Sequence, residues 1–119
     1  MSGRARRGRA AERVVIDLLV ARGFEVLGTN VRLGALELDI VAREGPLLVV
    51  VEVRTRGRGA YESAFASVSP AKRARLRDAT ERLWRTFSAD VTIERVRIDV
   101  ASVDLDARPV TVEIAEGLR

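Results

Sequence analysis

The chain has 119 residues, of which 47% are hydrophobic and 32% are charged, a composition typical of one soluble domain with a single core. It contains no cysteine and no histidine, which excludes disulfides, thiolate or imidazole metal ligands, and catalysis by Ser–His or Cys–His pairs. The formal net charge of +4 favours a polyanionic partner, and any bound metal is expected to be a hard cation such as Mg²⁺ or Mn²⁺ on oxygen ligands.

Hydrophobic residues recur at helical spacing over residues 9–22, and Gly23 is a typical helix-terminating residue. A first helix is therefore predicted there, after a basic and flexible tail over residues 1–8. A second helix is predicted from Pro70 to Phe87, after a loop rich in glycine and serine. Five segments have the alternating or β-branched pattern of strands. They are residues 24–33, 36–42, 47–55, 91–103 and 109–115. The order αβββαββ indicates a single α/β domain over residues 9–119.

No apolar run approaches the ~20 residues that span a bilayer. The basic N-terminus is followed by an apolar stretch without a signal-peptide cleavage site. A cytoplasmic location without a membrane partner is expected.

Two of the predicted strands carry pairs of charged residues two positions apart. Because side chains alternate along a strand, Glu37 and Asp39 share one face, and Glu52 and Arg54 share a face of the next strand. The opposite face of the first of these strands would carry Leu36, Leu38 and Ile40.

A hairpin turn over residues 43–46 would place Asp39 opposite Glu52 and Glu37 opposite Arg54. This register is open, because a slip of one residue would send the two sets to different faces. In this register Asp39 and Glu52 are like charges, which destabilise a sheet when they face each other. A divalent cation between them would relieve the repulsion, and otherwise one of them must bind a proton or an arginine.

Glu12 is a further candidate acid, in the first turn of the predicted first helix. It lies beside an apolar stripe that includes Val15 and Leu19, so it could face the sheet. The alternative is an acid stabilised by the helix dipole near an N-terminus.

The run N-x-R…E-L-D-I-V…VVEVRTR over residues 30–56 resembles the YraN (UPF0102) family of small bacterial proteins. The family's pattern is close to N-x-R…G-E-I-D-L-I…F-V-E-V-K-x-R. The segments AAE at Glu12, SPAKRARLRDA and VRIDV extend the resemblance over nearly the whole chain. The resemblance implies a restriction-endonuclease-like fold of the PD-(D/E)xK type, with a mixed central sheet flanked by helices. It also implies kinship with archaeal Holliday-junction resolvases, which are dimers, so a homodimer with a valine-rich strand at its edge is a further expectation.

By the same resemblance, Asp39 and Glu52 are metal-binding carboxylates for Mg²⁺ or Mn²⁺, and Glu12 is an accessory acid at the metal. Residue 54 is their charged companion, and Glu37 would orient a water molecule or pair with Arg54. The implied activity is phosphodiester cleavage in branched or damaged DNA. The alternative is a non-catalytic nucleic-acid-binding or adaptor protein on the same fold, and a protein partner is not identified by the sequence.

One departure from the family pattern concerns its lysine, which is Arg54 here. An arginine can bind phosphate but cannot act as a base, because its pKa exceeds ~12. Either the metal alone activates water, or Lys72, the only lysine in the chain, supplies an ammonium from the second helix. Seven basic residues are candidates for contacts with nucleic acid. They are Arg7, Arg9, Arg32, Arg56, Arg58, Lys72 and Arg73. The alternative for the second helix is a solvated surface paired with nearby acids.

Overall fold

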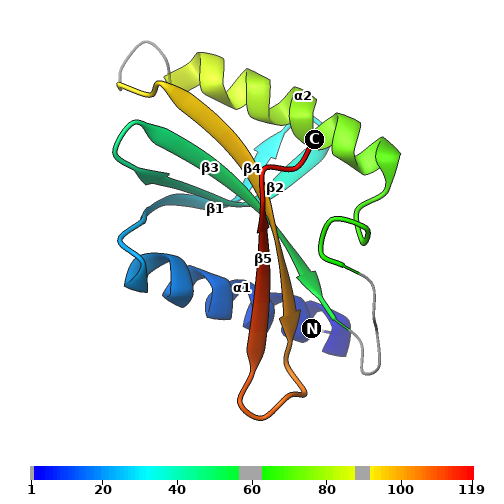
Figure 1. Cartoon of the computed structure of the whole chain (residues 1–119). Coiled ribbons are helices and arrows are strands. Elements are labelled where there is room, and N and C mark those ends of the chain that lie inside the picture. The colour runs from blue at the N-terminus through cyan, green and yellow to red at the C-terminus, as the bar shows by residue number, and fades with distance from the viewer. Residues whose placement is uncertain (1, 57–62, 88–91) are drawn as a thin grey trace.

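The computed structural model describes residues 2–56, 63–87 and 92–119, and these residues form two helices and five strands (Figure 1). The helices are α1 (Gly3–Ala21) and α2 (Pro70–Phe87). The strands are β1 (Glu25–Leu33), β2 (Leu36–Glu44), β3 (Leu47–Thr55), β4 (Arg95–Asp104) and β5 (Thr111–Glu116). The predicted order αβββαββ and the single α/β domain are confirmed.

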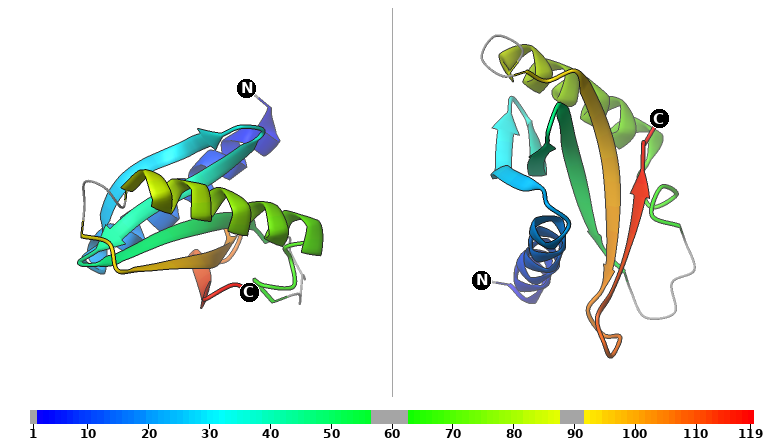
Figure 2. Two further views of the ribbon diagram at one scale, coloured as in Figure 1. Left: turned by 90° about the horizontal axis from the view of Figure 1, so that it is seen from above. Right: turned by 60° about the vertical axis from the view of Figure 1, so that its left-hand side comes forward.

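The five strands form one mixed sheet in the order β1-β2-β3-β4-β5. Neighbouring strands are antiparallel except β3 and β4, which are parallel and are connected through α2. Figures 1 and 2 show α1 and α2 on opposite faces of this sheet. The architecture is consistent with the nuclease-like α/β fold that the resemblance implied.

Each helix covers its own hydrophobic core. On the α1 side, the core includes Ala11, Val15, Leu19, Ile40, Val49 and Val51. On the α2 side, it includes Leu38, Val50, Leu76, Ala79, Leu83 and Val100. Strand β3 lies at the centre and is covered on both faces, which explains its continuous run of apolar residues. The expected dimer edge stays a prediction, because β3 is central but β5, which contains Val112, is an edge of the sheet. The homodimer itself stays a prediction.

Helix α1 begins six residues earlier than predicted. The hydroxyl of Ser2 accepts a hydrogen bond from the N–H three residues ahead, which caps the helix and lets it start at Gly3. Residues 3–8, expected to be a tail, form its first turns. Glu12 therefore lies in the third turn rather than the first, and the helix dipole does not account for it. The helix ends at Gly23 as expected, with a φ of 92° that favours glycine.

The sheet opens between β2 and β3. Arg43 pairs with Leu48, so the predicted hairpin register is confirmed, and the pairing continues to Ile40 and Val51. Beyond that point β2 pairs only with β1, and β3 pairs only with β4. Figure 1 shows the first residues of β2 behind α2, whereas β3 continues towards the N-terminal end of α1.

The predicted alternation in β2 is wrong at Ile40. Leu38 belongs to the core on the α2 side, but Ile40 belongs to the core on the α1 side. The irregularity lies opposite Asn30, because β1 pairs residues 29 and 31 with residues 40 and 38. Asn30 has a φ of 52°, in the left-handed region that asparagine tolerates better than most residues. This local distortion lets Asp39 and Ile40 both project towards α1.

Neither described helix is long and apolar enough to span a membrane.

Candidate functional site

Asp39 lies where β2 and β3 separate. Its Oδ2 accepts a hydrogen bond of 2.8 Å from the N–H of Val53. If the pairing of β2 with β3 continued to this point, that N–H would donate to the backbone of β2 instead. The carboxyl is half-buried and lines a small hollow of about 150 Å³ with Glu12 and Thr55. The opening in the sheet thus brings this acid against the backbone of β3.

Glu52 is almost completely buried, with 2% of its surface exposed. Its Oε1 accepts from the Nζ of Lys72 on α2 at 2.7 Å. Its Oε2 is buried and has no hydrogen-bond partner among the described residues. A buried carboxylate oxygen without a donor is costly, so this atom is open to a proton or a cation.

The two carboxyl groups interact directly. The pKa of Asp39 is raised to about 7, first by burial of the carboxyl group and then by the nearby charge of Glu52. The N–H of Val53 acts in the opposite direction, because it stabilises the ionised form. Asp39 and Glu52 are therefore close enough to interact, although Asp39 lies beside Glu12 of α1 and Glu52 is paired with Lys72 of α2, which covers the other face of the sheet.

Asn30 connects two further acids beside this pair. With its amide nitrogen facing them, Nδ2 donates to Glu37 Oε1 at 2.7 Å and to Glu12 Oε1 at 3.0 Å. Burial and the charge of Glu37 raise the pKa of Glu12, and the hydrogen bond from Asn30 lowers it. Asn30 was not among the predicted site residues, although the N-x-R motif contains it.

A test of this role compares two substitutions of Asn30. Alanine removes both hydrogen bonds and disfavours the positive φ, so the free energy of unfolding is expected to fall by about 1–2 kcal/mol. Glycine removes the same hydrogen bonds but tolerates the backbone conformation, and it should cost less. Urea unfolding of both variants measures the difference, and equal losses would contradict a contribution from the backbone.

The expected pairing of Glu37 with Arg54 is not what the structure contains. Glu37 Oε2 lies 3.7 Å from Nη2 of Arg32, the residue of β1 that pairs with Glu37 of β2. Arg54 follows Glu52 by two residues in β3 and makes no ion pair with an acid of the described segments. The guanidinium at the position of the motif's lysine therefore forms no ion pair with the buried acids.

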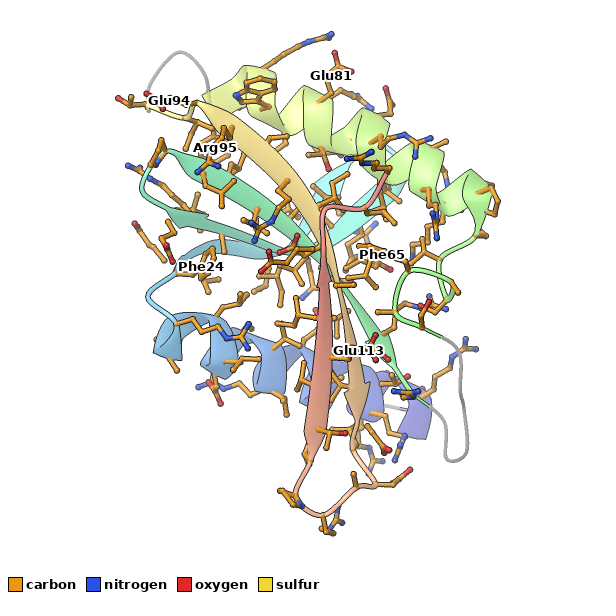
Figure 3. All side chains as sticks on the ribbon, viewed as in Figure 1. Phe24, Phe65, Glu81, Glu94, Arg95 and Glu113 are labelled. Atoms are coloured by element: carbon orange, nitrogen blue, oxygen red, sulfur yellow. The ribbon has the colours of Figure 1, made fainter. Side chains whose placement is uncertain are left out.

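Five of the six described basic residues that were predicted to bind nucleic acid have acidic or backbone partners within the chain. Arg7 forms an ion pair of 3.1 Å with Asp106 in the loop between β4 and β5. Arg56 approaches Glu113 of β5 at 3.5 Å, and Figure 3 labels this acid on the outer strand. Arg73 donates to the carbonyl oxygens of residues 65 and 68, which fixes the chain just before α2.

The remaining predicted basic residues differ in position. Arg9 is exposed and lines a hollow that also contains Glu12 and Asn30. Arg32 is exposed beside Glu37, and Lys72 contacts Glu52. Arg58 lies outside the described residues. Lys72 therefore contacts the buried pair, Arg32 contacts Glu37, and Arg9 lies near Glu12.

The acids do not form a complete set of metal ligands by themselves. Over the described segments, no group of three or more acidic side chains is arranged to hold a metal ion. Asp39 and Glu52 are close enough to contribute two oxygen ligands, and Glu12 lies beside them as a more distant charge. Such a site would leave positions open for water or substrate oxygens.

A family model described as "Uncharacterised protein family UPF0102" matches residues 11–103. The chain belongs to this family. A UPF0102 protein of Sorangium cellulosum is 51% identical over 112 residues, which cover 92% of this chain and 78% of the relative. UPF0102 proteins of Streptomyces coelicolor and Kineococcus radiotolerans are 43% identical over 121 residues and 40% identical over 112 residues. These alignments cover 99% and 93% of this chain and 92% and 91% of the relatives.

The UPF0102 match spans every residue of the acidic site, from Glu12 to Lys72, but not Arg7 or Arg9. It also includes the VRIDV segment of β4, whose acid has a structural role. Asp99 is buried, binds the guanidinium of Arg97 through both oxygens at 2.8 and 2.9 Å, and accepts from the N–H of Gly117 at 3.1 Å. It ties the C-terminal segment to the sheet.

Proposed function

We propose that this UPF0102 protein is a metal-dependent nuclease that binds DNA and cleaves phosphodiester bonds. The observation that carries the proposal is the buried pair of Asp39 and Glu52, in which one carboxylate oxygen has no donor among the described residues. The pair lies where two neighbouring strands part, with Asp39 lining the small hollow beside Glu12 and Glu52 buried against Lys72. Two adjacent acids that repel each other are suited to a divalent cation.

The donor set fits Mg²⁺ or Mn²⁺ rather than a softer metal. Carboxylate oxygens are the available ligands, and the chain has no cysteine or histidine. Asp39 and Glu52 would hold the ion, and Glu12 would add negative charge from α1. When bound, such an ion lowers the pKa of water and stabilises charge that develops on a phosphate.

The residues around the pair would hold and orient the substrate. The N–H of Val53 fixes the Asp39 carboxyl at 2.8 Å, so this group needs little reorganisation to act as a ligand. The guanidinium of Arg54, free of ion pairs with the described acids, can bind a phosphate through two donors. Arg9 lies exposed on α1 beside the site and is suited to a backbone phosphate.

DNA is the proposed substrate class because the chain is basic and its cations lie near the acids. The resemblance to junction resolvases makes branched or damaged DNA the first form to test. Only 4% of the residues are aromatic, so stacking on bases is not the expected mode of recognition. Contacts with phosphates would dominate, and binding should weaken steeply as salt increases.

The test is a cleavage assay on single-stranded, duplex, flap and four-way DNA with Mg²⁺, Mn²⁺ or EDTA. Asp39→Asn and Glu52→Gln are expected to lower metal-dependent cleavage by more than about 100-fold, because each removes a charged ligand. Asp17→Asn is the matched control, since Asp17 is an exposed acid of α1 paired with Arg13 at 3.3 Å. Cleavage that is unchanged in Asp39→Asn would overturn the proposal.

A second candidate, a non-catalytic DNA-binding or adaptor protein, is favoured by Arg54 at the motif's lysine position. Calorimetry with Mn²⁺ separates the two. Binding that depends on Asp39 supports the nuclease, and DNA binding without any metal site supports the alternative.

A further inference from the structure

Lys72 is the cation that reaches the buried acids. Its Nζ lies 2.7 Å from Glu52 Oε1, and the two side chains are 30% and 3% exposed. Arg54, at the motif position, makes no ion pair with the described acids, although it follows Glu52 on the same strand. The family pattern places a lysine on this strand, two residues after the acid. In this chain the single lysine reaches the acid from helix α2 instead.

The position of Lys72 in α2 is unfavourable for the helix alone. Ser69 caps α2, and its Oγ accepts from the backbone N–H of Lys72 at 3.2 Å, which places this residue in the first turn. A cation in the first turn interacts unfavourably with the helix dipole. The contact with Glu52 offsets this cost. The cap and the contacts of Arg73 with the preceding segment fix the start of the helix, so the ammonium is held in place.

The ammonium also faces an open, positively charged hollow. This hollow has a volume of about 370 Å³ and lies between the turn joining β1 to β2 and the side of α2. Its charged lining residues are Lys72, Arg75, Asp78 and Arg82. Three cations and one acid favour an anionic group. An ammonium has three donors, so Lys72 can contact Glu52 and a phosphate oxygen together.

We propose that Lys72 is a catalytic residue of the nuclease site, where its ammonium binds the phosphate undergoing cleavage in place of the motif's lysine. This inference rests on the proposed function. Lys72 acts through its charge and its N–H donors, and no proton leaves it. Asp39 and Glu52 would hold the ion, whose charge would weaken the attraction between Glu52 and Lys72 and leave donors of the ammonium available to a phosphate oxygen.

The kinetic test compares Lys72→Met with Arg85→Met, a matched loss of charge at the far end of α2, where Arg85 pairs with Glu81 at 2.8 Å. Lys72→Met is expected to lower kcat by about 100-fold, as for other lost donors to a transition state. Mn²⁺ affinity should not fall, because a competing cation has been removed. Arg85→Met should cleave normally.

Rescue separates catalysis from a structural role. Arg54→Lys in the Lys72→Met background restores an ammonium at the motif position, and kcat should recover at least about tenfold. A lysine that only stabilises α2 would not be rescued from β3. Lys72→Met that cleaves as fast as wild type overturns the inference while the proposed function stands, as does a loss of kcat that Arg54→Lys leaves unchanged.

A second measurement does not depend on turnover. Lys72 carries the only side-chain amine, so reductive methylation with ¹³C-formaldehyde gives one lysine signal, apart from that of the α-amino group. With Ca²⁺ present, a short single-stranded DNA should shift this signal in wild type and not in Asp39→Asn. If wild-type protein binds the DNA and the signal does not move, the inference is overturned. If Mn²⁺ fails to broaden the signal and no cleavage occurs, the proposed function fails.

Discussion

Replacing Asp39 by asparagine is expected to raise the free energy of unfolding at pH 8 by about 2 kcal/mol. Burial and Glu52 raise the pKa of this carboxyl from 3.8 to about 7, so its ionised form is unfavourable in the folded protein. The difference corresponds to at most about 4 kcal/mol, and partial exposure of the group reduces it. Asparagine keeps an oxygen for the N–H of Val53 and removes the charge.

The sign follows from the raised pKa. The folded state binds the proton more tightly than the unfolded state, so the stability that Asp39 contributes is complete below about pH 4 and is lost as the pH rises through about 7. The advantage of Asp39→Asn should therefore be small at pH 4 and full at pH 8. Urea unfolding at both values measures it, with Asp17→Asn as the control. A variant that is less stable than wild type at pH 8 would contradict the buried, repelled pair.

A divalent cation is expected to restore this stability to the wild-type protein. At a Mn²⁺ concentration one hundred times the dissociation constant, binding to the folded state alone contributes about 2.7 kcal/mol. For a domain of this size that raises the melting temperature by roughly 10 °C. Thermal unfolding at pH 8 in Mn²⁺, Mg²⁺ or EDTA measures the shift.

Asp39→Asn and Glu52→Gln should lose most of this metal-dependent shift, because each removes one of the two proposed ligands. The shift should also shrink towards pH 5, where protons compete for Asp39. An equal shift in wild type and both variants would place the ion elsewhere on the protein.

The hairpin register was predictable from the sequence because a short turn and two strongly patterned strands allow few pairings. Arg43 and Leu48 pair as expected, and Asp39 is brought to Glu52. The start of α1 was not predictable from periodicity, since its first turns lack apolar residues and the capping serine lies at position 2. Because the helix starts at Gly3, Glu12 lies in its third turn rather than at its end.

Other features of the site depend on tertiary structure that a pattern does not encode. Strict alternation fails in β2 because Asn30 adopts a left-handed conformation, which no spacing of apolar residues reveals. Glu37 meets Arg32 rather than Arg54, because β2 pairs with β1 at this level and has left β3. The contact of Lys72 with Glu52 joins a helix to a strand, and the sequence distinguishes Lys72 only as the single lysine of the chain.

Because β2 and β3 separate at this point, the backbone N–H of Val53 can report on the state of the acidic pair. Its amide proton is held by the carboxyl of residue 39 instead of by a neighbouring strand, so its chemical shift and exchange rate should respond to anything that this carboxyl binds. Proton uptake and cation binding would move the same resonance in distinguishable ways. One amide signal in the centre of the sheet thus reports directly on the occupancy of the acidic pair.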